Sequence, residues 1–272
     1  MQQHNCLVNG LRIGGDAPVR LMGVINCSPE SFYRGSYTPA ESVHGRALAM
    51  VESGADMVDI GARSTAPGSR PITLAEEAAR MDEALRELDG TGVTVSVDVQ
   101  QPEVLDVCLR HDIHAVNDIT GLAGEQFART VADSGLPVFV MASLRRPGDA
   151  VGLAATLQAL ETVVERCSRF GIEDYVLDPG IGRWVPERTS EDDWELCRNF
   201  QLFLDFGRPV LAAVSRKTFI GELLGKPPED RLAGTLALTT MLVAAGAAVV
   251  RGHDVPETAD LLRVCAKMRQ RG

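Results

Sequence analysis

Short apolar runs alternate with longer amphipathic segments along almost the whole chain. The apolar runs are continuous rather than alternating, which is typical of parallel strands that are buried on both faces. Strands are expected near residues 21–26, 57–61, 94–99, 115–119, 137–142, 175–179, 209–215 and 247–251. Helices are expected near residues 39–53, 73–89, 102–110, 124–134, 151–169, 190–204, 231–246 and 255–269.

This alternation, with short links between the elements, predicts an α/β fold, a (β/α)8 TIM barrel of parallel strands. An open, doubly wound sheet is the alternative, but no Gly-x-Gly-x-x-Gly turn follows the first expected strand. The Asn9-Gly10 pair within residues 6–13 predicts an N-terminal β-hairpin, which we expect to cover one end of the barrel. Because no low-complexity segment or Pro/Gly-rich linker divides the chain, residues 1–272 are expected to form a single domain.

Polar residues recur where the expected strands end. Asp178 precedes Pro179 and Gly180, and an Asp in that setting is commonly a loop cap. Its recurrence at other strand ends favours a binding role instead, because residues after the carboxyl ends of barrel strands form the active face. The other polar strand ends include Asn26, Asp59, Asp98, Asn117, Asp118, Ser215, Arg216 and Lys217.

Asp98, Asn117, Asp178 and Lys217 form the first expected constellation. Carboxylates and an amide are costly to bury without hydrogen-bond partners. A planar heterocycle with a guanidine-like edge supplies a fork of two N–H groups for one carboxylate, while the lysine can meet a ring oxygen or nitrogen. The alternative is an internal salt bridge from Lys217 to one aspartate, which leaves the second carboxylate and Asn117 unexplained.

Arg251 and His253 end the last expected strand and, with Asn26 on the adjacent first strand, form an expected anion corner. Phosphate sites in these barrels often lie beside the last two strands, next to a helix start. Asn26 could also share an Mg²⁺ with a diphosphate, because oxygen ligands suit that ion. For His253 alone, a helix-capping role is the alternative. Cys27 is a weak candidate nucleophile, since no His stands nearby in the sequence.

Composition narrows the classes of function. The 272 residues are 45% apolar and carry a net charge of -10, which disfavours nucleic acid or an anionic membrane as a partner. Six dispersed cysteines, with no signal peptide and no run long enough to cross a bilayer, predict a cytoplasmic chain with reduced thiols. Segment 231–246 is apolar around nearly its whole circumference, so either neighbouring helices or a second subunit cover it, and we predict a homodimer.

Several ordered motifs together make the chain resemble the dihydropteroate synthase family. They are Gly23-Val24-Ile25-Asn26, Ser28-Pro29-Glu30-Ser31-Phe32, Ser64-Thr65-Ala66-Pro67-Gly68, Ser96-Val97-Asp98, Val116-Asn117-Asp118, Asp178-Pro179-Gly180-Ile181-Gly182, Ser215-Arg216-Lys217-Thr218-Phe219-Ile220-Gly221 and Arg251-Gly252-His253-Asp254-Val255. The resemblance covers nearly the whole chain. It implies a barrel that joins 6-hydroxymethyl-7,8-dihydropterin pyrophosphate to p-aminobenzoate and releases pyrophosphate with Mg²⁺, in a homodimer that uses its late helices.

The resemblance also implies roles for individual residues. Asp98, Asn117, Asp178 and Lys217 correspond to pterin contacts, with Met141 beneath the ring. Asn26, Thr65, Arg251 and His253 correspond to the pyrophosphate and Mg²⁺ corner. The expected catalytic residues are Asn26, Lys217, Arg251 and His253, with Asn26 as the metal ligand, and the substrate-binding set adds Thr65, Pro67, Met141, Ser215 and Thr218.

Departures from the family pattern cluster in the loops around the arylamine side. They are Glu30 and Arg34 in the first loop, Arg63 and Ala66 in the second, Ala142 after the fifth strand, and Arg183-Trp184 after Gly182. Arg34, Arg63, Arg145, Arg146 and Arg183 could receive a larger anionic arylamine such as a ribosyl-aminobenzene phosphate. Alternatively, they are solvated charges on a divergent synthase or on a pterin-binding paralogue without turnover. A pterin-dependent methyltransferase is a third alternative, but it has no evident need for the pyrophosphate corner.

Overall fold

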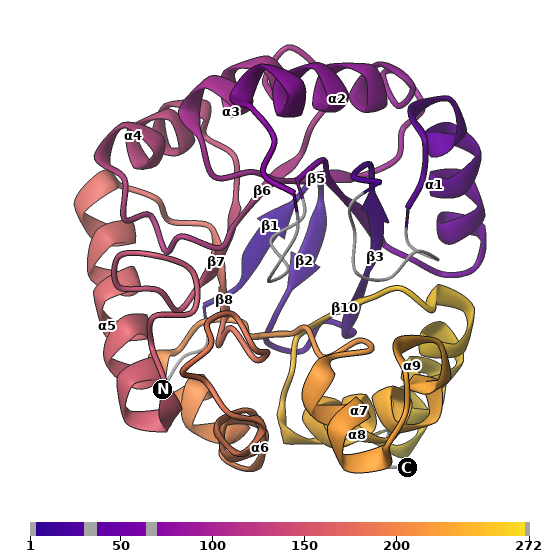
Figure 1. Cartoon of the computed structure of the whole chain (residues 1–272), viewed down its shortest axis with the longest axis vertical. Coiled ribbons are helices and arrows are strands. Elements are labelled where there is room, and N and C mark those ends of the chain that lie inside the picture. The colour runs from indigo at the N-terminus through magenta and orange to yellow at the C-terminus, as the bar shows by residue number, and fades with distance from the viewer. Residues whose placement is uncertain (1–3, 30–36, 64–69, 270–272) are drawn as a thin grey trace.

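The computed structural model describes residues 4–29, 37–63 and 70–269, which form a parallel barrel wrapped by helices (Figure 1). The described strands of this sheet run in the order β8-β7-β6-β5-β4-β3-β10-β9. They are β3 (Arg20–Asn26), β4 (Met57–Gly61), β5 (Val95–Asp98), β6 (Ala115–Asp118), β7 (Val138–Met141), β8 (Tyr175–Asp178), β9 (Leu211–Ala212) and β10 (Val249–Gly252). At the remaining seam Leu177 N donates to Pro209 O at 2.9 Å, so the barrel is nearly closed. The predicted TIM barrel is confirmed, and the open sheet is wrong.

Helices follow the strands on the outside of the barrel. They are α1 (Val43–Glu52), α2 (Leu74–Arg86), α3 (Pro102–Cys108), α4 (Glu125–Ser134), α5 (Gly152–Phe170), α6 (Ser190–Arg198), α7 (Thr218–Leu224), α8 (Leu232–Ala245) and α9 (Val255–Arg269). Capping boxes start α2, at Thr73 and Glu76, and α6, at Thr189 and Asp192. Across the described ranges, no helix combines the length and apolar character that crossing a membrane requires.

Two expected elements differ from the structure. The helix expected over 190–204 stops at Arg198, and the chain continues in 3-10 geometry over Phe200–Phe206, where Phe200 and Phe203 are buried against the barrel. The strand expected over 209–215 is reduced to Leu211–Ala212, because the chain then turns into the short helix α7, which the sequence pattern missed. Two helical turns show too little periodicity to be recognised.

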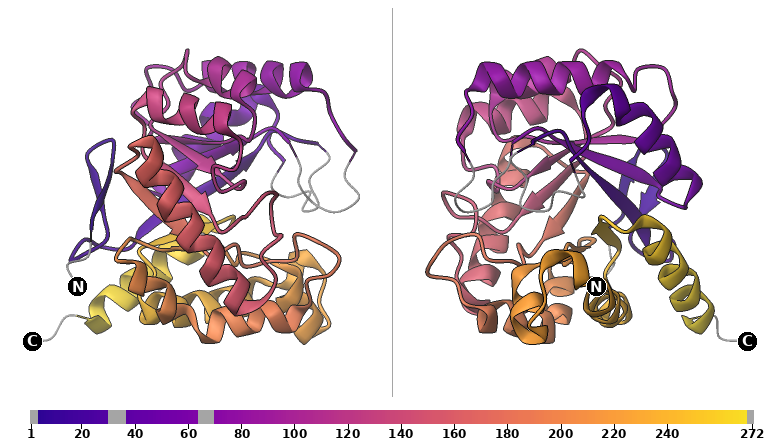
Figure 2. Two further views of the ribbon diagram at one scale, coloured as in Figure 1. Left: turned by 90° about the vertical axis from the view of Figure 1, so that its left-hand side faces the viewer. Right: turned by 45° about the vertical axis from the view of Figure 1, so that its right-hand side comes forward.

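The hairpin lies across the amino end of the barrel. Strands β1 (Cys6–Val8) and β2 (Leu11–Ile13) are antiparallel and joined at Asn9 and Gly10, both with positive φ. Val8 and Ile13 are fully buried among the first inward-facing residues of the barrel strands, such as Phe139. The predicted cover is therefore confirmed, and Figure 2 (left) shows the hairpin on the same side of the molecule as both chain ends.

Alternation along each strand builds the interior in layers. Side chains two residues apart on a strand share a face. The lowest inward layer is apolar and packs on the hairpin: Met22, Met57, Ala115, Phe139, Val176, Leu211 and Val249. Moving two residues toward the carboxyl ends reaches a layer on the same face that holds the polar residues Asp59, Asn117, Asp178 and Arg251 beside Met141. The inward-facing positions that fill the barrel therefore also place its polar side chains at one opening of the barrel. This opening, at the carboxyl ends of the strands, is the mouth.

Helix α8 has no polar face. Its inner side buries Leu238, Leu242 and Val243, while Met241 on the outer side is 68% exposed. An exposed apolar side chain on an apolar helix is typical of a surface that another subunit covers. The homodimer remains a prediction.

Candidate functional site

Arg251 joins three polar residues of the barrel mouth. Its Nε donates to Asp59 Oδ2 at 2.7 Å, and its Nη2 donates to Asp98 Oδ2 at 3.2 Å. Asn117 Nδ2 donates to the same Asp59 oxygen at 2.9 Å. Four strands, β10, β4, β5 and β6, therefore contribute to one hydrogen-bonded network, which reaches across β3 from β10 to β4.

Asp59 is the residue of this network that sequence reasoning did not assign to the site. It lies in the middle of β4, is fully buried, and its second oxygen, Oδ1, has no hydrogen-bond partner among the described residues. Asp59 lies two residues from both Met57 and Gly61 and therefore faces inward with them. This alternation along the strand is the feature of the sequence that could have assigned Asp59 to the site. Gly61 leaves room for Asp98, whose Cβ lies only 3.4 Å from where a Cβ on Gly61 would be.

Burial at the mouth shifts the pKa values of two of its carboxyl groups. Burial, together with the neighbouring carboxylate of Asp59, raises the pKa of Asp98 above its ordinary value, although Arg251 opposes the shift. Burial also raises the pKa of Asp178, against its hydrogen bond from Gly180 N and the charge of Lys217. Asp98 accepts a hydrogen bond from Arg251 and Asp178 accepts one from Gly180 N, so a ligand that offers further N–H groups fits these carboxylates.

Asn117 and Asp118 have different roles although they are adjacent. Asn117 points inward, whereas Asp118 points outward and is fully buried beneath its own loop. Asp118 accepts hydrogen bonds from Thr120 N at 2.7 Å and Leu122 N at 2.6 Å. Of this pair, Asn117 faces the mouth, and Asp118 shapes the loop that follows β6.

Lys217 reaches the mouth from the amino end of α7. The internal salt bridge to an aspartate is not formed: within the described ranges, the ion pairs of the mouth are made by Arg251. Lys217 instead extends its Nζ over the ring of Trp184, 4.8 Å from the ring centroid. Burial lowers its pKa, while Asp178 opposes that shift.

His253 and Ser215 form the anion corner beside Arg251. Ser215 Oγ lies 2.9 Å from His253 Nδ1 and accepts a hydrogen bond from His253 N at 3.2 Å. Burial, reinforced by the charges of Arg251 and Arg216, lowers the pKa of His253 to about 3, so the ring is neutral at pH 7. In a neutral imidazole one ring nitrogen donates and the other accepts, and Nδ1 shares one hydrogen bond with the Ser215 hydroxyl.

Arg216 holds the loop between Ser215 and Lys217 in place. It has a positive φ of 55°, which is strained for a side chain of this size. Its guanidinium binds Asp254 through two hydrogen bonds, of 2.9 and 2.6 Å, and its N–H donates to Thr235 Oγ1 at 3.0 Å. The contacts of this buried arginine therefore fix its two neighbours, while Arg216 itself points away from the mouth.

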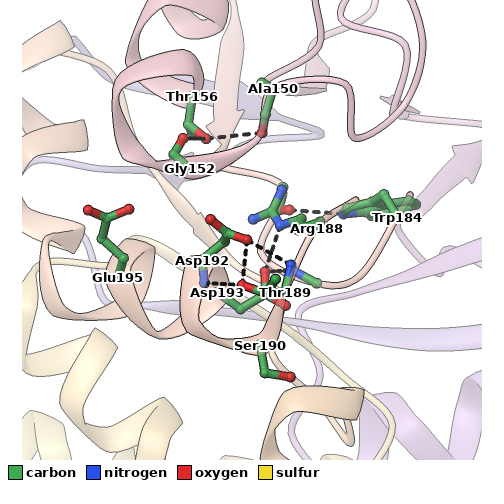
Figure 3. A network of polar contacts seen from close by, with 12 residues as sticks. Ala150, Gly152, Thr156, Trp184, Arg188, Thr189, Ser190, Asp192, Asp193 and Glu195 are labelled. Carbon is green, nitrogen blue, oxygen red and sulfur yellow. Dashed lines mark hydrogen bonds and ion pairs between the residues drawn. The ribbon is translucent and has the colours of Figure 1, made fainter. Parts of the chain in front are cut away.

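The loop after β8 is held by a buried ion pair (Figure 3). Asp193 Oδ1 accepts hydrogen bonds from Arg188 Nε and from Gly182 N, both at 2.8 Å. Both ionic side chains are at most 1% exposed. Trp184 Nε1 donates to Gly180 O at 2.9 Å. Sequence reasoning missed this pair, because the spacing from 188 to 193 is not a helical one.

The remaining expected residues are placed as follows. Met141 is buried at the end of β7, with its side chain against Gly180. Thr218 is exposed at the first position of α7, and Asn26 ends β3. Thr65 and Pro67 lie outside the described residues. Cys27 is buried, and burial raises the pKa of its thiol to about 12, which argues against a nucleophilic role.

The arginines of the divergent loops are partly engaged. Arg63 Nε lies 2.6 Å from Glu77, whose side chain is 2% exposed, and Arg183 lies 3.4 Å from Glu222. Arg145 and Arg146 are exposed, and Arg34 lies outside the described residues. Two of the five arginines proposed to receive an anion are therefore already neutralised by carboxylates of the chain.

Comparisons with known proteins agree with this geometry. Residues 22–253 match the model of the pterin binding enzyme family. The dihydropteroate synthase of Escherichia coli K12 is 31% identical over 90% of this chain and 89% of its own. The enzyme from Neisseria meningitidis serogroup B is 34% identical, over 97% of both chains.

Solved structures give the same result. The dihydropteroate synthase of Xanthomonas albilineans with 4-aminobenzoic acid matches with a TM-score of 0.87 and 31% identity over 100% of both chains. The same protein in complex with 7,8-dihydropteroate matches with a TM-score of 0.83 and 30% identity, over 99% of this chain and 100% of that one. With fold, ordered motifs and full-length relatives in agreement, the chain belongs to the pterin-binding enzyme family, as a homologue of the dihydropteroate synthases.

Proposed function

We propose that this protein is a dihydropteroate synthase that condenses 6-hydroxymethyl-7,8-dihydropterin pyrophosphate with p-aminobenzoate. The observation that carries the proposal is the convergence of Asp98, Asn117 and Asp178 at one mouth of the barrel, beside Lys217 and the Arg251–His253 corner. A pterin ring offers two adjacent N–H groups that can donate to one buried carboxylate. The relatives named above carry the same activity in their names.

Each group has a distinct task in this reaction. Asp178 and Asn117 bind the polar edge of the pterin, and Lys217 contacts a ring oxygen or nitrogen. Arg251 and neutral His253 hold the pyrophosphate, with Arg251 balancing charge as it departs. The arylamine nitrogen attacks the methylene carbon, so one C–N bond forms, the C–O bond to pyrophosphate breaks, and the amine loses one proton. Orientation and charge stabilisation suffice, and no covalent enzyme intermediate is required.

We infer that magnesium arrives with the pyrophosphate group of the substrate. No group of three His, Cys, Asp or Glu side chains within residues 4–29, 37–63 and 70–269 could hold a metal ion. Asn26 supplies one amide oxygen at the end of β3, and Mg²⁺ commonly takes its other ligands from phosphate oxygens and water. When bound, the ion would neutralise charge on the leaving pyrophosphate.

The second candidate, a larger anionic arylamine, is weakened by the pairing of Arg63 with Glu77 and of Arg183 with Glu222. A direct comparison tests it: p-aminobenzoate and a ribosyl-aminobenzene phosphate are each incubated with the pterin pyrophosphate and Mg²⁺, and pyrophosphate release is measured. We expect faster release with p-aminobenzoate. The opposite order would favour the second candidate, whereas pterin binding without any release would identify a binding paralogue.

Asp178→Asn tests the pterin site itself. We expect this variant to lose measurable pterin binding in calorimetry, because it removes the buried acceptor charge that meets the pterin N–H groups. Unchanged affinity would mean that Asp178 is structural. We further propose that the protein acts in the cytoplasm as a homodimer, with no nucleic acid or membrane partner.

A further inference from the structure

Lys217 is enclosed by a loop that the expected mechanism does not use. Its aliphatic stem runs along Gly182, where an added Cβ would lie 2.8 Å from Nζ and 3.1 Å from Cδ. On another side, the ring of Trp184 lies 4.8 Å from Nζ. The ammonium is therefore held between a bare backbone and an aromatic ring.

Trp184 is itself fixed at both ends. Its indole N–H donates to Gly180 O at 2.9 Å. Its Cβ occupies the space above Gly148, because a Cβ added to that glycine would lie 2.0 Å from it. Gly148 has a φ of +76° and belongs to a turn in which Asp149 accepts hydrogen bonds from Leu144 N and Arg145 N. A rigid turn after β7 thus sets the position of an indole that comes from the loop after β8.

Charged groups on several elements surround Lys217. Asp178 on β8 and Asp193 on α6 favour the charged form, whereas Arg251 on β10 and Arg188 before α6 oppose it. Burial opposes it as well. An aromatic face attracts a cation through its quadrupole, most strongly for the indole, and the attraction grows when water is excluded.

We propose that Trp184 is a positioning residue that holds the Lys217 ammonium, through the face of its indole ring, at the pterin-binding mouth. This role rests on the proposed function, and it belongs to the Arg183-Trp184 segment in which the chain departs from the family pattern. The alternative is that Trp184 only fills the space above Gly148. The two differ in one respect: only the first requires a positive charge at position 217.

A double-mutant cycle separates the two roles. The full-length protein is studied as wild type, Trp184→Leu, Lys217→Met and the double variant, and the affinity for 6-hydroxymethyl-7,8-dihydropterin pyrophosphate is measured by calorimetry without arylamine. We expect Trp184→Leu to weaken binding about tenfold, the upper part of the range for a cation over an indole. In the Lys217→Met background the same change should cost less than about twofold, because no cation remains to be held. Equal losses in both backgrounds would overturn the proposal.

A conservative variant supplies the second criterion. Trp184→Phe keeps an aromatic face but loses the N–H to Gly180, so we expect its affinity to lie within about threefold of wild type. Gly148→Ala displaces the indole from the opposite side without touching Lys217, and it should weaken pterin binding as Trp184→Leu does. Retained affinity in Gly148→Ala, in a protein that is folded by circular dichroism, would contradict the positioning role.

Fluorescence gives a readout that does not depend on any substrate. The chain has two tryptophans, and Trp194, which packs edge-on against Phe219 with centroids 4.7 Å apart, does not belong to the Lys217 contact. In a Trp194→Phe background the emission of Trp184 is observed alone. Lys217→Met should then shift this emission, whereas Lys226→Met, at an exposed position, should not. If the wild type failed to bind pterin, the proposed function would be wrong. The emission of Trp184 would still test whether Lys217 contacts its indole ring.

Discussion

Replacing Asp59 by asparagine tests the network at the base of the mouth. The substitution keeps the shape of the side chain but removes the charge that accepts hydrogen bonds from Arg251 and Asn117, at 2.7 and 2.9 Å. Removing one partner of a buried ion pair costs about 3–5 kcal/mol, because the other charge remains buried. Arg251 keeps its contact with Asp98 at 3.2 Å, and its side chain is 21% exposed. We therefore expect the free energy of unfolding to fall by about 3 kcal/mol, the lower end of that range.

The free energy of unfolding is measured by urea denaturation at pH 7.5, and pterin affinity is measured by calorimetry. We expect affinity to fall by at least about tenfold, because Asn117 and Arg251 lose the carboxylate that orients them. Asp56→Asn is the matched control: Asp56 also binds an arginine, Arg20, at 2.8 Å, but at the amino end of β3.

The control should lose about 1 kcal/mol of stability, since its side chain is 23% exposed, and it should keep full pterin affinity. The reasoning is refuted if Asp59→Asn loses less than about 1 kcal/mol of stability and binds pterin normally. Equal effects of the two variants on pterin affinity would also count against it, because they would mean that the mouth responds to general loss of stability.

Three further perturbations address the scaffold, the pH dependence and the assembly. Gly221→Ala should lose more than about 2 kcal/mol of stability in urea unfolding, because its Cβ would lie 2.1 Å from Arg231 Nε. The control, Gly45→Ala in α1, should gain about 0.5–1 kcal/mol, because nothing lies within 4 Å of the added Cβ. The pKa of His253 is about 3 in the folded protein, well below its ordinary value of 6.5, so the unfolded chain binds this proton first as the pH falls. The difference in free energy of unfolding between wild type and His253→Gln should therefore decline below pH 6.5, by up to about 1.4 kcal/mol per pH unit. Met241→Lys should convert the expected dimer to a monomer in light scattering at micromolar concentration, and a persistent dimer in this variant would place the interface elsewhere.

Much of the fold could be predicted from local pattern, because each buried parallel strand is a separate apolar run. The carboxyl ends of those runs then identified the face on which Asp98, Asn117 and Asp178 meet. Asp59 was counted among the polar residues near strand ends but was given no role in the site, because it lies in the middle of β4 rather than at its end. Only the alternation of the strand, in which every second residue from Met57 faces inward, assigns Asp59 to the mouth.

Pairing among long charged side chains was less predictable. Arg251 was expected to face an anion, and in the structure it contacts two carboxylates of the mouth. Arg63 was considered as a receptor for an anionic substrate, yet it lies against buried Glu77. Several partners are within reach of an arginine, and the choice depends on burial that the sequence pattern does not reveal. The same holds for Arg188 and Asp193, which meet across a loop.

The hairpin has a practical consequence for experiments on this enzyme. Leu7 N in β1 donates to Asp174 Oδ1, and Asn9 in the turn donates through Nδ2 to Thr94 Oγ1, both at 3.0 Å, so the hairpin is tied over the amino end of the barrel. The N and C marks lie on the same side of the molecule as the hairpin (Figure 2, left). An affinity tag or a sensor-chip tether attached at either terminus should therefore leave the opposite opening facing the solution, so that small molecules reach it unhindered.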